Sequence, residues 1–335
     1  MTLKKSLNGY CETIEPIRAL VITGPTASGK TAVSLEIAKA VNGEILSCDS
    51  MQVYRHMDIG TAKATAEEQS QVPHHLIDIV EPWEEFCVAD YCEAAKAAAY
   101  QVASAGKLPI FVGGTGLYVT SLIEGYSYKE TASSDPALSE ELRRTAATQE
   151  GVDSLYAYLA EKDPLAAEKI HRNNTKRLLR AVELYRLTGQ TQQERNRASK
   201  QAGSFLRAQV FAVETERQAL CERINRRVDQ MMEDGLIEEV REVTELCRLH
   251  GQTLSRTAAQ AIGYKETLAY LRGEMGREEL AEAIKKATRK YAKRQMTWLR
   301  KWPWVKWIQQ QKKTDMVSAI LSHLSENADY LSENN

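Results

Sequence analysis

The sequence predicts an α/β protein, with helices flanking a parallel sheet and an all-helical insertion interrupting the chain before its last strands. Two observations lead to this fold class. Short apolar strands alternate with helical stretches as far as Val112, and a block of helical patterns without a convincing strand follows from Tyr118 to Leu206. The predicted strands lie at 18–23, 44–48, 75–80, 108–112 and 207–213.

The insertion is predicted from its helix signals. Asp135-Pro136 and Asp163-Pro164 each place a capping side chain before a proline at the first helical position. Helices are expected there at 136–149, 151–161, 164–170 and 175–188, and beyond the last long strand at 216–234, 237–250, 257–272 and 277–301, before an edge strand at 304–308. We therefore assign 1–122 and 205–312 to the sheet core, 123–204 to the insertion, and 313–335 to a peripheral C-terminal segment.

Bulk composition excludes several classes of protein. The 335 residues are 43% hydrophobic and 27% charged, which is ordinary for a globular protein. No apolar run approaches the roughly 20 residues of a membrane helix, and the first 18 residues lack a signal-peptide core. The six cysteines form no C-x-x-C pair, so neither a zinc site nor a disulfide framework is indicated. We expect a cytoplasmic protein that does not associate with membranes.

Positive charge is clustered although the net charge is only −1. The segment 285–306 contains nine Lys or Arg and no acidic residue, and the segment 172–200 contains eight against two glutamates. Such clusters are typical of surfaces that bind phosphate backbones. Either basic segment taken alone could instead be a helix face exposed to solvent, with no nucleic-acid partner.

The strongest motif is a phosphate-binding loop between the first strand and the first helix. It matches G-x-x-x-x-G-K-[ST] through Gly24, Pro25, Thr26, Ala27, Ser28, Gly29, Lys30 and Thr31. A glycine turn at a helix start leaves backbone N–H groups free to surround phosphate oxygens. Lys30 would neutralise phosphate charge, and the Thr31 hydroxyl would reach a Mg²⁺ ion. The motif does not indicate which phosphate compound is bound.

Two further strand ends carry candidate site residues. Asp49 follows the strand at 44–48, and it would bind a metal, accept a proton, or cap the turn toward Val53. Gly113-Gly114-Thr115-Gly116 follows the strand at 108–112, which suits either close approach of a ligand or a tight turn. The pair His74-His75 is given a structural role, because neighbouring residues on a strand point to opposite faces and cannot bind one metal together.

Several segments together resemble one family, the bacterial tRNA dimethylallyltransferases, also called tRNA isopentenyltransferases or IPP transferases. They lie at 24–31, 49–63, 73–78, 113–118, 174–183, 262–266 and 287–300. The resemblance implies a P-loop-type core and transfer of a dimethylallyl group from dimethylallyl diphosphate to N6 of adenine 37 of tRNA. It also implies that the loop at 24–31 holds the diphosphate of the donor instead of cleaving ATP.

The same resemblance implies roles for individual residues. Asp49 would accept the proton of N6, Thr26 and Arg227 would act beside it in catalysis, and Thr31 would bind Mg²⁺. The anticodon stem-loop of a tRNA would be contacted by Asp49, Ser50, Met51, Gln52, Thr115, Lys176, Arg177, Leu178, Leu179 and Arg180, together with basic residues of the helix at 277–301. The expected oligomeric state is a monomer.

Two other functions fit the phosphate-binding loop by itself. A small-molecule kinase would turn over ATP with a small acceptor, and a nucleotide switch or RNA-binding module would bind without forming a product. The basic runs favour RNA over a small acceptor, and the complete set of resembling segments favours the transferase.

Overall fold

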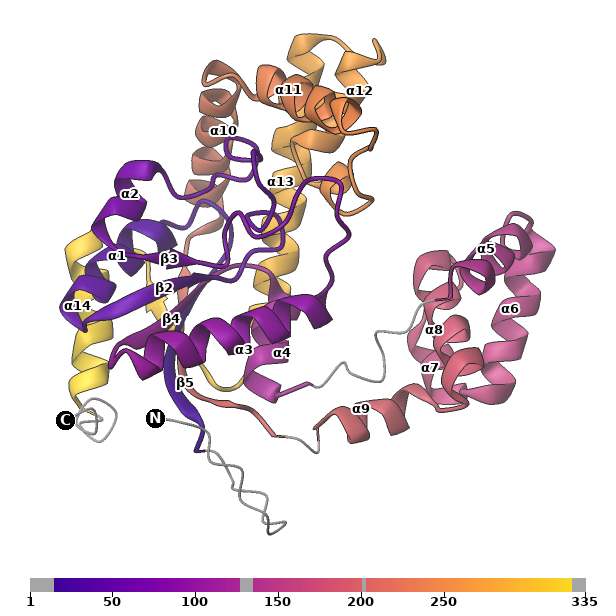
Figure 1. The fold of residues 1–335 in the computed structure, drawn as a ribbon, viewed down its shortest axis with the longest axis horizontal. Helices are drawn as coiled ribbons and strands as arrows, with labels where there is room; N and C mark the ends of the chain where they lie inside the picture. Colours follow the sequence, from indigo (N-terminus) through magenta and orange to yellow (C-terminus); the bar gives the residue numbers. More distant parts are fainter. Residues whose placement is uncertain (1–14, 127–134, 201–202, 327–335) are drawn as a thin grey trace. The chain divides into compact units, whose positions relative to one another are not determined.

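The computed structural model describes residues 15–126, 135–200 and 203–326. It contains a six-stranded sheet (Figure 1). Its strand order is β3-β2-β4-β1-β5-β6, and every neighbouring pair is parallel. This confirms the predicted fold class. The strands are β1 (Ile17–Thr23), β2 (Gly43–Ser47), β3 (His74–His75), β4 (Leu108–Gly113), β5 (Leu206–Glu214) and β6 (Val305–Gln309).

The described residues form two compact units. The first comprises residues up to Phe86, Glu93–Val119 and residues from Phe205 on, and the second comprises Cys87–Cys92 and Thr120–Ser204. The sheet belongs to the first unit. Helices that lie in it or cross its boundary are α1 (Lys30–Ala40), α2 (Ala66–Gln71), α3 (Val88–Ser104), α4 (Gly116–Glu124), α10 (Arg217–Glu233), α11 (Leu236–Leu249), α12 (Tyr264–Leu271), α13 (Arg277–Leu299) and α14 (Lys313–Ser325).

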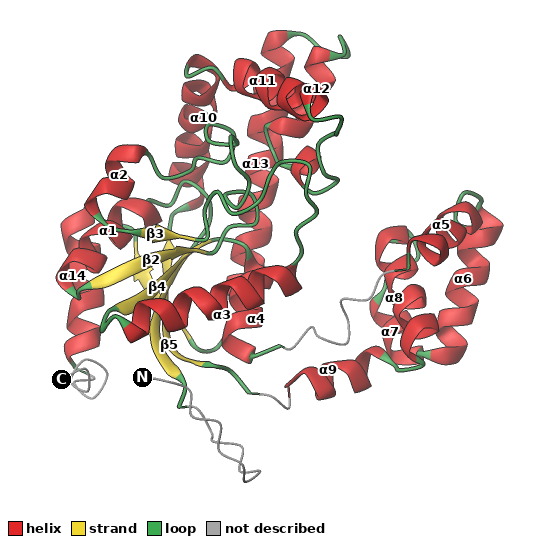
Figure 2. Cartoon of the chain, viewed as in Figure 1, coloured by secondary structure: helices red, strands yellow, loops and turns green. Residues whose placement is uncertain are grey.

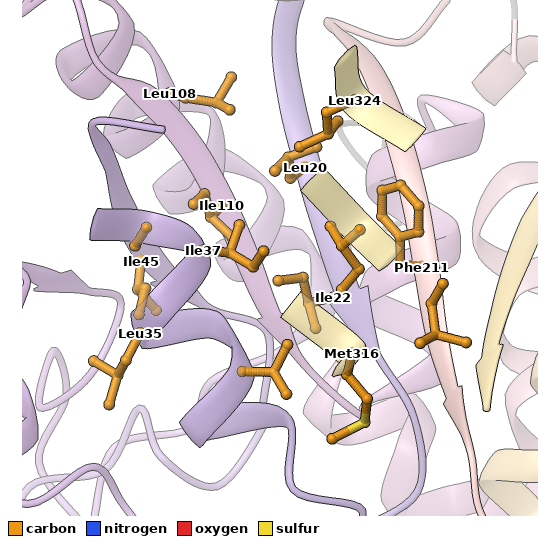
Figure 3. Close-up of a cluster of buried hydrophobic side chains, with 14 of the residues drawn as sticks. Leu20, Ile22, Leu35, Ile37, Ile45, Leu108, Ile110, Phe211, Met316 and Leu324 are labelled. Atoms are coloured by element: carbon orange, nitrogen blue, oxygen red, sulfur yellow. The ribbon is translucent and has the colours of Figure 1, made fainter. Parts of the chain in front are cut away.

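The main core lies between one face of the sheet and the helices α1 and α14 (Figure 3). The strands supply alternate apolar residues such as Ile22 and Ile110, which are fully buried. Helix α14 adds Met316, Ile320 and Leu324, each at most 5% exposed. We expected 313–335 to be peripheral, but the apolar residues of α14 complete this core. Residues 327–335 lie outside the described part of the chain.

The second unit consists of helices and loops among its described residues (Figure 2). Its helices after α4 are α5 (Pro136–Thr145), α6 (Gln149–Lys162), α7 (Pro164–Lys169), α8 (Thr175–Thr188) and α9 (Gln192–Lys200). Asp135 and Asp163 cap α5 and α7 as predicted, each accepting a hydrogen bond from a backbone N–H of the first turn. Helices α5 to α8 supply a separate apolar core that includes Leu155 and Val182.

Three predicted elements differ from the structure. The strand expected at 75–80 is only His74–His75, because Leu76 and Asp78 adopt left-handed φ angles of 63° and 54° that a strand does not accommodate. The helix expected at 257–272 is divided into a short 3₁₀ turn at Ala258–Gln260 and α12. The helix expected at 136–149 ends at Thr145, since the Thr148 side chain caps the next helix.

Candidate functional site

The loop at 24–29 lies at the carboxyl end of β1, and α1 begins directly after Gly29. Parallel pairing brings the ends of β2 and β4 to the same edge of the sheet. A cavity of about 580 Å³ opens there, lined by these three strand ends, by residues 60–63, and by α10 and α13. The predicted residues Thr26, Lys30, Thr31, Asp49–Gln52 and Arg227 all line it.

The cationic side of the cavity is formed by Lys30 and Arg227. Lys30 Nζ donates to the carbonyl of Pro25 at 2.8 Å. Burial, together with the nearby Arg227 guanidinium, lowers the pKa of Lys30 to about 8, although Asp49 opposes this shift. Arg227 Nη1 lies 3.3 Å from Thr26 Oγ1, so the predicted catalytic pair is in contact. Both cations are half-buried beside a phosphate-binding loop, which is an arrangement suited to a polyphosphate anion.

Asp49 faces these cations from the end of β2. Burial raises the pKa of its carboxyl group, and the Met51 N–H and the Lys30 ammonium oppose that rise. The Met51 N–H donates to Asp49 Oδ1 at 2.9 Å, so the side chain does cap its own turn. A carboxylate with a raised pKa at a cavity wall is also suited to accepting a proton.

A hydrogen bond joins the turns that follow β2 and β4. The Ser50 N–H donates to Thr115 Oγ1 at 3.0 Å, which places Thr115 beside the Asp49 turn. The Gln52 side chain makes hydrogen bonds within the protein. Its Oε1 accepts from Ser47 Oγ at 2.9 Å, and its Nε2 donates to the carbonyl of Ala62 at 3.2 Å. His75 is likewise structural and pairs with Glu44 at 2.6 Å.

Gln295 of α13 is a site residue that the sequence analysis missed. It is 6% exposed and accepts a hydrogen bond from the Thr26 N–H at 2.9 Å, while its amide donates to the carbonyl of Gly114 at 2.8 Å. A Cβ atom at Gly114 would lie 2.2 Å from Gln295 Nε2, so the glycine permits this close contact. One neutral side chain thus joins the phosphate-binding loop to the glycine loop after β4.

The basic residues predicted for RNA contact lie in two separate places. In the second unit, Lys176 and Arg177 at the start of α8 are exposed. Arg180 forms an ion pair with the buried Glu183 at 2.6 Å. Leu178 is fully buried in the core of that unit, so its side chain cannot contact RNA, contrary to expectation. Leu179 is half-buried.

Helix α13 carries the second basic group, formed by Lys286, Arg289 and Lys293. Lys286 and Lys293 are exposed, whereas Arg289 donates to Asn225 Oδ1 at 2.6 Å. The tryptophans at its C-terminal end contact one another, since the Trp302 and Trp304 rings stack with centroids 4.8 Å apart.

The parts of the chain that the structure describes contain no group of three His, Cys, Asp or Glu side chains able to hold a metal. Among the same residues, no helix is long and apolar enough to cross a membrane.

Comparison with known proteins identifies the family. The model of the IPP transferase family matches residues 52–302, and that of the isopentenyl transferases matches 17–78. The chain belongs to the IPP transferase family. A tRNA dimethylallyltransferase of Acetivibrio thermocellus is 48% identical over 292 residues, covering 86% of this chain and 90% of the relative.

Solved structures of IPP transferases and related enzymes share the fold. The full-length tRNA isopentenylpyrophosphate transferase of Bacillus halodurans is 40% identical, with a TM-score of 0.67 and coverage of 95% of this chain and 97% of that one. A eukaryotic dimethylallyltransferase acting on tRNA is 27% identical, with a TM-score of 0.78 and coverage of 94% and 80%.

Replacement of Gln295 tests its bridging contact. Gln295→Glu keeps an acceptor for the Thr26 N–H but turns a carboxylate oxygen toward the carbonyl of Gly114. Since an unsatisfied buried polar group costs about 1–3 kcal/mol, we expect kcat/KM for the phosphorylated substrate to fall about 10- to 100-fold. Steady-state kinetics would measure this, with Thr297→Ala on the exposed side of α13 as control. Parent kinetics in Gln295→Glu would contradict the assignment.

The pKa of about 8 for Lys30 predicts a pH dependence of anion binding. Below pH 8 the ammonium is charged and attracts a diphosphate; above it, the amine becomes neutral and the attraction is lost. We expect inorganic pyrophosphate to bind less tightly above pH 8 in calorimetric titrations, although pyrophosphate itself becomes more charged. Lys30→Arg stays protonated and should lose this decline. If affinity for pyrophosphate fell equally above pH 8 in the parent and in Lys30→Arg, the titrating group would not be Lys30.

Proposed function

We propose that this protein transfers a dimethylallyl group from dimethylallyl diphosphate to N6 of adenine 37 in the anticodon stem-loop of tRNA. The observation that carries the proposal is that Lys30, Arg227 and Asp49 line the same cavity, with the two cations facing the carboxylate. Family membership supports the reaction class, because relatives along nearly the whole chain are tRNA dimethylallyltransferases.

The donor diphosphate is assigned to the loop at 24–31. Lys30, Arg227 and backbone N–H groups of the loop supply positive charge for it. The apolar dimethylallyl group suits the part of the cavity lined by Val228, Met231 and Ile284.

The transfer step follows from these positions. The N6 amine of adenine attacks C1 of the dimethylallyl group, the bond from C1 to the diphosphate oxygen breaks, and its electron pair leaves with diphosphate. Lys30, Arg227 and Thr26 stabilise the charge that develops on the departing diphosphate. The proton released from N6 passes to the Asp49 carboxylate, whose burial-raised pKa favours that role.

A Mg²⁺ ion would bind in this cavity together with the diphosphate of the substrate. Thr31 lines the cavity next to Lys30, and its hydroxyl is the hard oxygen ligand that Mg²⁺ prefers. The remaining ligands would come from diphosphate oxygens and water. Bound there, the ion would further neutralise the departing diphosphate.

We assign the tRNA to one surface on each unit of the chain. A target base flipped out of its loop would meet Asp49, Ser50 and Met51 at the cavity wall. Thr115 lies beside them, since its hydroxyl accepts from the Ser50 N–H. In the second unit, the exposed Lys176 and Arg177, with Arg180 and Leu179 beside them, would contact the phosphate backbone. The first unit of one chain supplies every lining residue of the cavity, so the site is compatible with the proposed monomer. The cytoplasmic location is part of the same proposal.

One assay tests the proposed reaction. The protein is incubated with dimethylallyl diphosphate, Mg²⁺ and unmodified tRNA, and nucleosides are identified by mass. We expect N6-(dimethylallyl)adenosine with the parent tRNA, none with a tRNA that has guanine at position 37, and negligible ATP hydrolysis. ATP turnover without this product would overturn the proposal.

Asp49→Ala should lower turnover by about 10²- to 10⁴-fold through loss of the general base. Asp49→Asn separates the two uses of this side chain, because an amide oxygen still accepts from the Met51 N–H but takes up no proton. A comparable decrease in both variants is expected. Parent turnover in Asp49→Asn would mean that the carboxylate only caps its turn.

A double substitution tests the RNA contact of the second unit. Lys176→Ala with Arg177→Ala removes two exposed charges and should reduce the log–log salt slope of tRNA binding by about two units. Filter binding at several salt concentrations would measure it. The control is Arg143→Ala with Arg144→Ala, which removes two exposed charges from α5 of the same unit. Equal slopes for the two double variants would reject the assignment to α8.

A further inference from the structure

A buried carboxylate outside the transfer chemistry holds one wall of the cavity. Glu239 of α11 is 9% exposed and accepts hydrogen bonds from three successive backbone N–H groups, those of Asp58 and Ile59 on Oε2 at 2.9 and 2.5 Å and that of Gly60 on Oε1 at 3.0 Å. The hydroxyl of Tyr264 donates to the same Oε1 at 2.9 Å. Four donors from two separate segments therefore converge on one carboxylate.

The packing around this contact leaves little freedom. Tyr264 is fully buried, and burial together with Glu239 raises the pKa of its hydroxyl, so the group remains a donor. A Cβ atom at Gly60 would lie 2.8 Å from Tyr264 Cε2, so the loop backbone rests directly on the ring. Hydrogen bonds to a buried charged acceptor are stronger than neutral ones.

The loop that Glu239 holds is joined to the strand end that carries Asp49. Residues 60–63 of this loop line the cavity. Gln52 Nε2 donates to the carbonyl of Ala62 at 3.2 Å, and Ser47 Oγ at the end of β2 donates to Gln52 Oε1 at 2.9 Å. Hydrogen bonds and the backbone of the loop thus connect α11 to Gln52 and Ser47, which lie on either side of Asp49 in the sequence.

A second buried charge fixes the base of the same loop. Lys63 Nζ contacts Asp58 Oδ1 at 2.5 Å and Asp78 Oδ1 at 2.6 Å, and it also donates to the carbonyl of Tyr54 at 2.8 Å. These contacts close the loop on itself and on the neighbouring segment. Glu239 is the contact that ties it to α11.

We propose that Glu239 is a positioning residue for dimethylallyl transfer, which acts by holding the loop at 58–63 and, through Gln52, the turn that presents Asp49. The inference rests on the proposed role of Asp49 as general base. It assigns a function in catalysis to the Asp-Ile-Gly-Thr-Ala-Lys segment, which contributes backbone groups and a buried lysine instead of reacting side chains.

Glu239→Gln changes the hydrogen bonding at this point while keeping the shape of the side chain. Its amide nitrogen would face backbone N–H groups or the Tyr264 hydroxyl, so at least one donor meets another donor. The loop would then shift, and with it the Asp49 turn. Because misplacement of a catalytic group by about 1 Å costs roughly 10²-fold, we expect the rate of the transfer step to fall about 10- to 100-fold.

Single-turnover kinetics measures this step without interference from partial unfolding. With enzyme in excess over tRNA and saturating dimethylallyl diphosphate, the observed rate constant does not depend on the fraction of inactive protein. Glu239→Gln should show the reduced rate constant while binding inorganic pyrophosphate with parent affinity. Tyr264→Phe should show a smaller reduction. Glu238→Gln, at the exposed neighbouring position, should match the parent.

Two results would overturn the inference. One is a parent single-turnover rate constant in Glu239→Gln, and the other is a reduced rate constant accompanied by loss of pyrophosphate binding, which would indicate general disruption of the site. Asp49→Asn in the same series separates this inference from the proposed function. If Asp49→Asn retains the parent rate constant, the general base assignment fails, whatever the result for Glu239→Gln.

Discussion

The parallel pairing of β4 between β1 and β2 is the constraint on which the whole cavity depends. The pairing aligns Thr23 with Gly113 and Ser47 with Val112, so three loops leave the sheet at one edge. It continues past the strands, because the Cys48 N–H donates to the carbonyl of Val112 at 2.8 Å. The loops that carry Lys30, Asp49 and Gly114, which are far apart in the sequence, thereby meet at one edge, where α10 and α13 complete the cavity.

The side chain that joins two loops of the cavity is neutral, although the groups around it are charged. Lys30 and Arg227 have lowered pKa values and Asp49 a raised one, because burial disfavours each charge. Gln295 joins two loops through one donor and one acceptor and adds no charge, so it stabilises the arrangement without changing the protonation of its neighbours.

The sequence allowed prediction of local features more readily than long-range ones. The phosphate-binding loop, the strand end at Asp49 and the two Asp-Pro caps each depend on a few adjacent residues, and all have the expected local structure. Gln295 lies 269 residues from its partner Thr26 and resembles any polar residue of a basic helix. Glu239 likewise looks like an ordinary acidic residue near a helix start, because a buried acceptor of backbone N–H groups has no signature in sequence.

Helix α14 has a consequence for the order in which the protein folds. β1 and α1 come from the first 40 residues, yet their apolar faces are covered by Met316, Ile320 and Leu324 near the other end of the chain. During synthesis, the strand that precedes the phosphate-binding loop must therefore wait until α14 has been made before its hydrophobic layer closes. Contacts this distant in sequence slow folding, and apolar surface stays open to chaperones or to aggregation until α14 has been synthesised.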